Sequence, residues 1–244
     1  MSQPSNTAKS LADVCPWTLP DTMRITGHLG WEQDARPDKF RRHLLETENG
    51  EVAFHSDGWV SADRRQSMRY CRLQTRKVDA AVITIYPTAS PHALPVFVAE
   101  WVVVAHVFHL ALIDVAEIGQ RSSLHSNLSQ VFPAIGGHAA QLLGSAVDES
   151  DWFKSIRSPW VLHTSSTVEQ EPAIRAIFLQ YLTLANSEFF LNSRLAANVG
   201  SDHDLVTQYK NFVMINTPGR KWISKLVGPE FTDEFMSKWH YGPA

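Results

Sequence analysis

The sequence predicts an α+β domain, because segments with the pattern of strands fill its first half and segments with the pattern of helices fill its second half. Between residues 48 and 115, short apolar runs are separated by turn residues, as in β structure. After residue 122, apolar residues recur at spacings of three and four, which is typical of one face of a helix. Strands that follow one another in this way most simply form an antiparallel sheet, against which the later helices pack.

The composition is that of a globular protein, with 44% hydrophobic and 19% charged residues. The 244 residues are enough for one sizeable domain with its own core. Residues 1–20 are expected to be a flexible leader, because three prolines interrupt any regular element there, and residues 21–244 to be a single domain. The N-terminus lacks the apolar stretch of a signal peptide. A cytoplasmic location is therefore expected, or the plastid stroma in a eukaryote, although no transit peptide is evident.

Charge and motif content exclude several classes of function. A net charge of −3 and a pI of about 6.4 argue against nucleic acid as a partner. No glycine-rich nucleotide motif is present, which disfavours a reductase that uses a nicotinamide cofactor. Cys15 and Cys71 lack the spacing of a metal-binding pair, and the histidines show no metal spacing either, so no metal site is predicted.

The early strands are predicted from alternation and turn residues. Residues 48–74 read as strands with turns at the Asn-Gly pair 49–50 and the Asp-Gly pair 57–58, since both dipeptides are favoured in tight turns. Residues 79–86 are a short apolar strand, which Pro87 ends. These segments lead into the most apolar stretch of the chain.

Residues 94–114 are long enough to suggest a membrane span. A carboxylate in the middle of such a span, however, costs about 2.5–3.5 kcal/mol, and Glu100 occupies that place. The enrichment in valine and phenylalanine instead predicts two buried strands that meet at a turn near Ala105 and His106, the second running over residues 107–115. No membrane span is therefore predicted.

Strand alternation places Glu100 in an apolar row with Val98 and Val102, while Trp101 faces the other side of the sheet. An ionised carboxylate in such a row must be paired, hydrogen-bonded, or protonated near neutral pH. Two interpretations follow from the residues alone. Glu100 is either a proton donor in a cleft or a core glutamate paired with a neighbouring histidine or arginine.

The second half predicts helices. Residues 122–143 surround Pro133 and are expected to form two short helices. A long helix begins near Pro172 and ends near Ala185, and another spans residues 205–213. Thr217 and Pro218 have the pattern of a helix N-cap followed by proline at the first helical position, and Gly228 ends that helix. The residues after it, up to about 242, form a final amphipathic stretch.

Four stretches, in this order, resemble the ferredoxin-dependent bilin reductases and their relative, red chlorophyll catabolite reductase. They are MRYCRLQ at 68–74, LPVFVAEWVV at 94–103, DWFKSIRSPWVLHTSSTVEQEPAIRAIFLQYLTLA at 151–185 and INTPGRKWISKLVGPEFTDEFM at 215–236. Asp114 follows the second stretch at the family's spacing. The resemblance implies an α/β/α three-layer sandwich with a central antiparallel sheet flanked by helices. It also implies an open-chain tetrapyrrole bound between the sheet and the C-terminal helices, no bound cofactor, and electrons from a reduced [2Fe-2S] ferredoxin as partner.

The same resemblance assigns candidate residues. Glu100 stands where the family has its central catalytic aspartate, and Gln74 stands where one member has a catalytic glutamate. A catalytic histidine of that member maps near Val82, which cannot transfer a proton. His109 maps to a small residue of the pocket, and His106 is three residues before it. Both histidines are expected at a strand edge or in the pocket, and Glu100 and His109 are the predicted catalytic pair.

Further candidates come from the C-terminal half. Asn216 and Thr217 stand where the family has an Asn-Asp pair, and Arg220 matches an arginine that binds a substrate propionate. On the residues alone, Thr217 is the N-cap of a helix and Asp114 is structural, at a strand end. Trp152 is either core or pocket wall.

The resemblance therefore predicts a ferredoxin-dependent reductase of a biliverdin-type bilin or a chlorophyll catabolite, with a radical mechanism and Glu100 as proton donor. Because Gln74, Val82 and Thr217 replace acidic or histidine positions of the family, a two-electron reduction fits better than a four-electron one. Two alternatives stay open: a carrier or chaperone that binds a linear tetrapyrrole without reducing it, and an unrelated small-molecule enzyme on the same scaffold.

Overall fold

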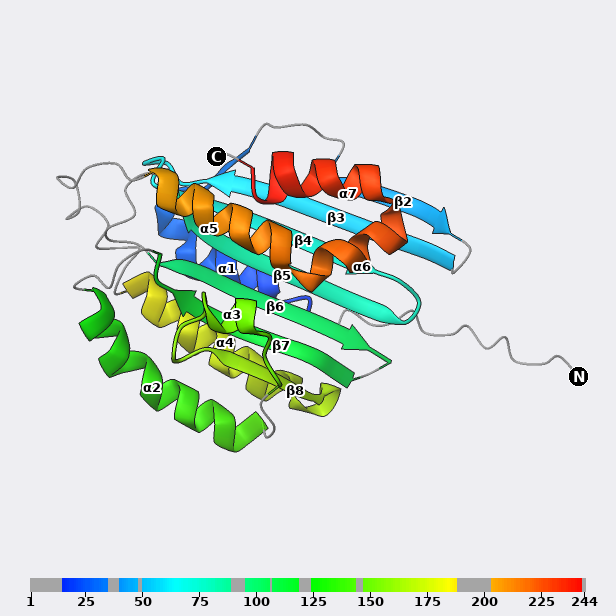
Figure 1. Ribbon diagram of the computed structural model, residues 1–244. Coiled ribbons are helices and arrows are strands. Elements are labelled where there is room, and N and C mark those ends of the chain that lie inside the picture. The colour runs from blue at the N-terminus through cyan, green and yellow to red at the C-terminus, as the bar shows by residue number, and fades with distance from the viewer. Residues whose placement is uncertain are drawn as a thin grey trace, which may run out of the picture.

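The computed structural model describes residues 15–34, 40–47, 50–88, 95–105, 107–118, 124–143, 147–187 and 203–242. Its eight strands form one antiparallel sheet in the order β1-β3-β4-β5-β6-β7-β8, with β2 paired to β3 (Figure 1). The predicted antiparallel sheet is thus confirmed. The strands are β1 (Glu32–Gln33), β2 (Arg42–Thr47), β3 (Gly50–Val60), β4 (Gln66–Gln74), β5 (Val78–Pro87), β6 (Val96–Val104), β7 (Val107–Ala116) and β8 (Leu162–Thr167).

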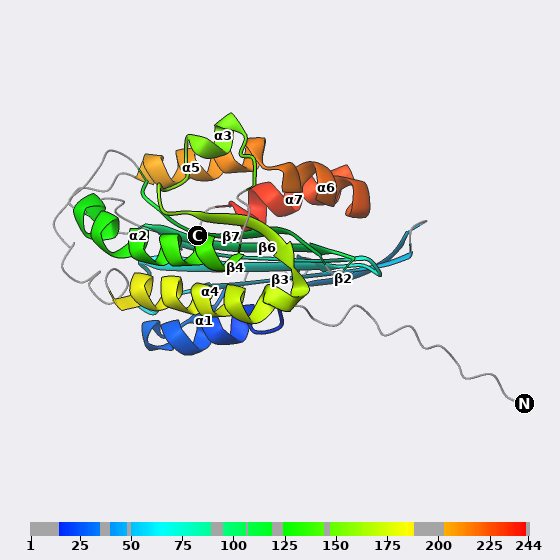
Figure 2. The same cartoon turned by 90° about the horizontal axis from the view of Figure 1, so that it is seen from below.

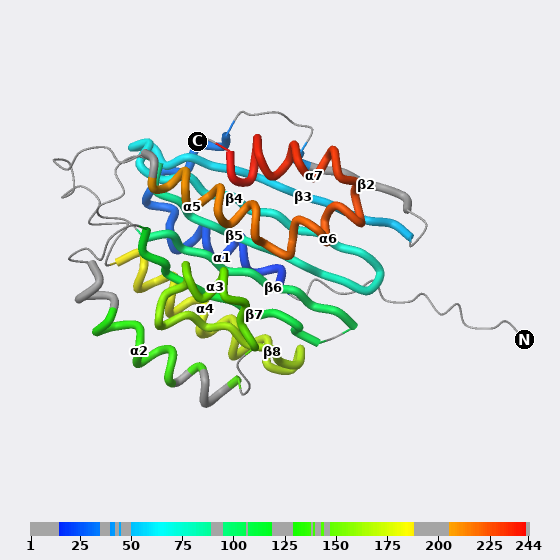
Figure 3. Tube along the Cα trace, in the orientation of Figure 1, coloured from blue at the N-terminus to red at the C-terminus, as the bar shows by residue number. Residues whose placement is uncertain are grey.

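Helices cover both faces of the sheet, which confirms the predicted three-layer sandwich. Figure 2 views the sheet edge-on, with α1 and α4 below it and α3, α5, α6 and α7 above it. The same arrangement can be followed along the Cα trace (Figure 3). Helix α2 packs against α4 and β8. The helices are α1 (Thr18–Thr26), α2 (Leu124–Leu143), α3 (Asp151–Lys154), α4 (Glu171–Ala185), α5 (His203–Asn216), α6 (Pro218–Val227) and α7 (Pro229–Phe235), followed by a π-helical turn, η6 (Met236–His240).

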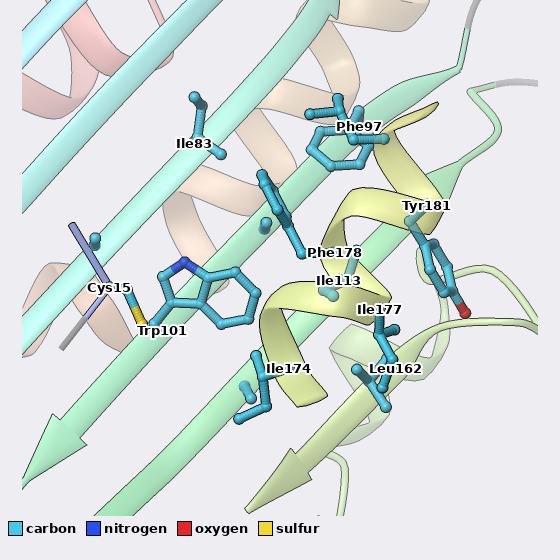
Figure 4. Close-up of a cluster of buried hydrophobic side chains, with 14 of the residues drawn as sticks. Cys15, Ile83, Phe97, Trp101, Ile113, Leu162, Ile174, Ile177, Phe178 and Tyr181 are labelled. Carbon is cyan, nitrogen blue, oxygen red and sulfur yellow. The ribbon is translucent and has the colours of Figure 1, made fainter. Parts of the chain in front are cut away.

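The larger hydrophobic core lies between the sheet and the layer of α1 and α4. Figure 4 shows Phe178 of α4 pointing toward Trp101 of β6, with Phe97 nearby. The ring of Phe178 meets those of Trp101 and Phe97 edge-on, at centroid distances of 5.9 and 6.1 Å. Trp17 adds a fourth ring, 5.2 Å from Phe178. Edge-to-face contacts of this kind add to the stabilisation from apolar burial, so this aromatic cluster fixes α4 and α1 on the sheet.

A second, smaller core lies on the opposite face, under α7. Phe40 and Phe54 from the N-terminal side of the sheet pack against Phe235 and Trp239. The rings of Phe54 and Phe235 are perpendicular, with centroids 4.9 Å apart. The buried residues of this core on the sheet belong to β3 and β4. The core therefore does not fill the space over β5, β6 and β7 on the same face.

The central hairpin has the predicted form. Strand β6 ends at Val104, Ala105 turns with a φ of +48°, and β7 begins at Val107. His106 lies outside the described residues. Along β6, Phe97, Ala99, Trp101 and Val103 are buried in the larger core. The residues between them, Glu100 included, are less buried and face α6, as the alternation of strand side chains predicts.

The predicted turn at residues 57–58 is wrong, because β3 continues through them to Val60. Gly58 is needed because the side chains of Arg69 and Trp239 pack close to the backbone of β3. It lies directly opposite Arg69 of β4. A Cβ atom on Gly58 would come 2.6 Å from Arg69 Nη1 and 3.2 Å from Trp239 Cζ2. The Asp-Gly pair suits either role, and only the packing of Arg69 distinguishes them.

We expect Gly58→Ala to destabilise the protein by about 1–3 kcal/mol, since Arg69 cannot move away cheaply. The Arg69 guanidinium is buried and donates to Asp34 Oδ2 at 2.8 Å and to the Trp239 carbonyl at 3.1 Å. Urea denaturation monitored by circular dichroism measures the effect. The control is Gly137→Ala in α2, where an added Cβ meets nothing within 4 Å. That variant should be neutral or more stable. An equal loss in both variants would contradict this role for Gly58.

Two other expectations are corrected. Helix α2 is continuous past Pro133, where two helices were expected. Phe132 beside it is fully buried and stacks on Trp160 at 6.0 Å, so tertiary packing outweighs the cost of an internal proline. Residues 17–20 do not belong to a flexible leader, because Trp17 is buried in the larger core and α1 begins at Thr18, while residues 1–14 lie outside the described part of the chain.

Candidate functional site

A cavity of about 560 Å³ lies between the sheet and the helical layer that contains α3 and α6. Its floor is made by strands β4 to β8, and its cover by the start of α6 and the segment around α3, both of which cross this face in Figure 1. A volume of this size suits a small-molecule ligand. The apolar part of the lining comprises Leu73, Ala80, Ala81, Val82, Trp101, Val102, Val104, Leu110, Leu112, Val147, Trp152, Phe153, Pro218, Trp222 and Ile223.

One row of residues crosses the cavity floor from strand to strand. The register pairs Cys71 with Val82, Val82 with Glu100, Glu100 with Leu112, and Leu112 with His163. All five residues line the cavity. Neighbouring strands are about 4.8 Å apart, so Glu100 and His163 are separated by two strand spacings, about 10 Å along the floor.

Glu100 is the acid at the centre of this row. Val82 and Leu112 flank it across the sheet. Within the described part of the chain, no ion-pair or hydrogen-bond partner holds its carboxylate. Removal from water alone raises the pKa of Glu100 to about 7. Of the two interpretations of this residue, the structure therefore supports an unpaired carboxyl group that keeps a substantial protonated fraction at neutral pH, and not a paired core glutamate.

His163 on β8 is a cavity residue that the sequence analysis did not identify. Its Nδ1 lies 3.1 Å from Glu149 Oε1, and the other oxygen of Glu149 accepts a hydrogen bond from Arg157 Nε. The imidazole ring meets Phe153 edge-on at 5.2 Å. In the sequence, only strand alternation around Leu162 hints at an inward side chain. The pairing of β8 with β7, about 50 residues away, is what places His163 beside Leu112.

Comparison with known proteins adds a fold relationship. None of the known protein-family models matches the sequence, and neither does any curated protein. Among solved structures, phytochromobilin synthase from tomato, crystallised in complex with biliverdin, matches with a TM-score of 0.75. The match covers 92% of this chain and 81% of that chain, at 11% sequence identity.

This chain has the fold of phytochromobilin synthase. The resemblance to bilin reductases is thereby confirmed at the level of the fold. In the tomato protein the fold binds biliverdin.

Two further candidates line the cavity of this phytochromobilin synthase fold. Trp152 of α3 forms part of the wall, which settles its position as pocket rather than core. Thr217 also lines the cavity and is the N-cap of α6, since its Oγ1 accepts from the Gly219 amide at 3.3 Å. The predicted N-cap is confirmed. The hydroxyl is thus held at the cavity edge by the helix that it caps.

Gln74 and His109 lie away from the cavity. Gln74 alternates to the opposite side of β4 from Leu73, which is the cavity residue. His109 is exposed at a β-bulge in β7, where the register against β6 shifts and one residue is left unpaired. The resemblance places His109 at a pocket position, but the bulge interrupts the alternation of β7 at this point.

Two C-terminal candidates have local partners instead. Asn216 donates from its side-chain amide to the Phe212 carbonyl at 2.8 Å, as part of the end of α5. Arg220 forms an ion pair with Asp233 of α7, with Nη2 and Oδ1 2.7 Å apart. Neither residue is among those that line the cavity. Arg220 thus contacts a neighbouring helix, and its propionate contact stays a prediction.

Asp114 has the expected structural role. Its carboxylate is buried and accepts hydrogen bonds from the Ser158 amide, at 3.0 Å, and from the Ser158 hydroxyl. Burial raises the pKa of Asp114 to about 6, while the hydrogen bonds from Ser158 oppose this shift. The pair fixes the segment after α3 to β7 and so supports one wall of the cavity.

The charges around the cavity are sparse. Glu100, Asp148 and His163 are the titratable polar residues among those described in the lining, besides the buried thiol of Cys71, and none of the described lining residues is Lys or Arg. Within the described residues, no group of three or more His, Cys, Asp or Glu is arranged to hold a metal ion. No described helix is long and apolar enough to cross a membrane. A second, more open hollow of about 700 Å³ lies between residues 154–160 and α5 and does not include Glu100.

Proposed function

We propose that this protein binds an open-chain tetrapyrrole in the cavity and reduces it, with Glu100 as the main proton donor. The observation that carries the proposal is the carboxyl of Glu100, which lies in the apolar floor of the cavity with its pKa raised to about 7. A general acid is most effective when its pKa is near the working pH. The likeness to phytochromobilin synthase, whose structure contains biliverdin, supports the choice of ligand.

The lining suits a flat conjugated molecule. Trp152, Phe153 and Trp222 offer aromatic surface, and the floor is mostly aliphatic. Because the described lining has no Lys or Arg, the propionate groups of a bilin are better placed at the cavity opening, in water, than against the floor. The conjugated rings then lie over Glu100.

Reduction of one double bond adds two electrons and two protons to the tetrapyrrole. In this proposal the electrons arrive singly from a reduced [2Fe-2S] ferredoxin, and the conjugated ligand itself carries the unpaired electron between the two transfers. Glu100 transfers its proton to the ligand and is reprotonated from water at the cavity opening. The chain's part is to hold the ligand over this acid and to keep bulk water away from the radical.

One experiment tests the proposal directly. Anaerobic incubation with biliverdin, reduced ferredoxin and a regenerating system, followed by chromatography, should show conversion to a dihydrobilin. Omission of ferredoxin should stop the reaction. Tight binding without any spectral change over hours would exclude reductase activity toward biliverdin.

One observation favours a second candidate, a protein that binds the tetrapyrrole without reducing it. Val82 neighbours Glu100 across β5 and β6, at the position where the resemblance places a catalytic histidine. A binding protein needs no proton-transfer group at the position of Val82. In that case Glu100→Gln would still show the absorbance change on biliverdin binding, and neither the wild type nor this variant would yield a product.

A further inference from the structure

The cavity contains a second group that can carry a proton, at the β8 end of the floor. Both His163 and Glu149 are nearly buried, with side-chain exposures of 12% and 11%. Glu149 bridges two partners, since one carboxylate oxygen contacts His163 Nδ1 and the other accepts from Arg157 Nε. The three side chains form a chain of contacts that runs from the cavity wall to the segment after α3.

This arrangement fixes which ring nitrogen a ligand can meet. With Nδ1 directed at Glu149, Nε2 is the nitrogen of His163 that remains for a molecule in the cavity. The edge-on contact with Phe153 limits rotation of the ring. The backbone is held as well, because the Val147 amide donates to the His163 carbonyl at 3.3 Å. A carboxylate that orients a histidine in this way is a recurring arrangement in proton transfer.

The position of His163 relative to Glu100 suits one extended ligand. The two residues lie in the same cross-strand row, with Leu112 between them. A separation of about 10 Å along the floor lets a linear conjugated molecule cover both groups at once. The His163–Glu149 pair therefore differs from a pair on the outer surface, because His163 lines the space that the ligand would fill.

We propose that His163 is the second catalytic acid of this site, and that it donates a proton to the tetrapyrrole at the β8 end of the cavity. The inference rests on the proposed function. The two-electron reduction then balances on this chain: a one-electron donor, reduced ferredoxin, supplies each electron, and Glu100 supplies one proton. His163, as the imidazolium, supplies the other from Nε2 and is left as the neutral ring with Nδ1–H directed at Glu149. Both residues regain their protons from water after the product leaves.

The test compares four proteins in single-turnover reactions with biliverdin and reduced ferredoxin: wild type, His163→Gln, Glu100→Gln and His55→Gln. His55 is the control, because it also contacts a carboxylate, with Nε2 2.7 Å from Asp57 Oδ2, but lies on β3 outside the cavity. Binding is followed by absorbance, product by chromatography, and the radical by electron paramagnetic resonance.

In His163→Gln we expect biliverdin binding within about threefold of wild type, product formation slowed by about 10²- to 10⁴-fold, and an accumulated one-electron-reduced radical. His55→Gln should behave as wild type. In His163→Ala, added imidazole should restore part of the rate, which a purely structural histidine would not show. Near-wild-type product formation by His163→Gln, with Glu100→Gln inactive, would overturn the role of His163 alone. Absence of turnover in wild type would overturn the proposed function and this inference with it.

Discussion

Glu100→Gln is expected to lower the rate of tetrapyrrole reduction by about 10²- to 10⁴-fold while biliverdin binding stays within about threefold of wild type. The amide keeps the shape of the protonated carboxyl, which is the form that the apolar wall favours near neutral pH. It has no acidic proton to transfer at this pH. Steady-state kinetics and absorbance titration with the same preparations separate the loss of chemistry from any loss of binding.

The matched control for this variant is Asp148→Asn. Asp148 is the other carboxylate in the described lining, but it is exposed to solvent. Its substitution makes the same change of group at the edge of the cavity, and we expect the rate to change little. If Glu100→Gln kept full activity, or if Asp148→Asn lost as much, Glu100 would not be the proton donor.

The raised pKa of Glu100 also predicts how activity and stability change with pH, and both should fall as pH rises. The donating form is the protonated acid, so kcat/KM should fall as pH rises through about 7. Stability should respond as well: between the unfolded pKa, about 4.3, and the folded value, the native state binds more protons than the unfolded one. The stability of wild type should therefore fall with rising pH across this window relative to Glu100→Gln. Parallel stability curves for the two proteins would contradict the raised pKa.

The largest expected effect on stability comes from Phe178→Ala, at about 3–5 kcal/mol. Phe178 is fully buried and its ring contacts those of Trp17, Phe97 and Trp101. Truncation leaves a cavity among three aromatic rings, two from β6 and one from the start of α1, so the surroundings cannot collapse to fill it. Urea denaturation should show a lower midpoint with an unchanged slope.

Phe212→Ala provides the control for that measurement. Phe212 lies on α5 with 39% of its surface exposed, and its removal should change the free energy of unfolding by less than about 0.5 kcal/mol. A comparable loss in both variants would show that the aromatic cluster around Phe178 has no special weight in the core.

Much of the fold could be predicted because strand alternation and helix periodicity are local. The hairpin of β6 and β7, the opposite faces of Glu100 and Trp101, and the N-cap at Thr217 all follow from residues within one element. The errors have a different origin. Asp57 and Gly58 suit a turn as well as a strand, and only Arg69, on another strand, decides between them.

The site was harder to predict because side-chain direction depends on register. A shift of one residue turns a strand side chain to the other face, which is why Leu73, not Gln74, reaches the cavity. The bulge at His109 has the same effect. His163 could not be placed at all from its own strand, because its neighbours in the row come from β6 and β7. Resemblance transfers positions along a chain, but not these directions.

The alternation along β6 has a consequence for how such a chain can diversify. Glu100 and Trp101 are adjacent in sequence, yet the side chain of Glu100 lies on the cavity floor while the ring of Trp101 is buried in the larger core. Residues of the core need only be apolar and of matching volume, and many combinations satisfy this requirement. Residues on the cavity side, under the proposed function, must instead suit the ligand. Selection for binding and selection for folding thus act on alternate residues of the same strand. This independence is one physical route by which two chains keep the same fold at 11% sequence identity.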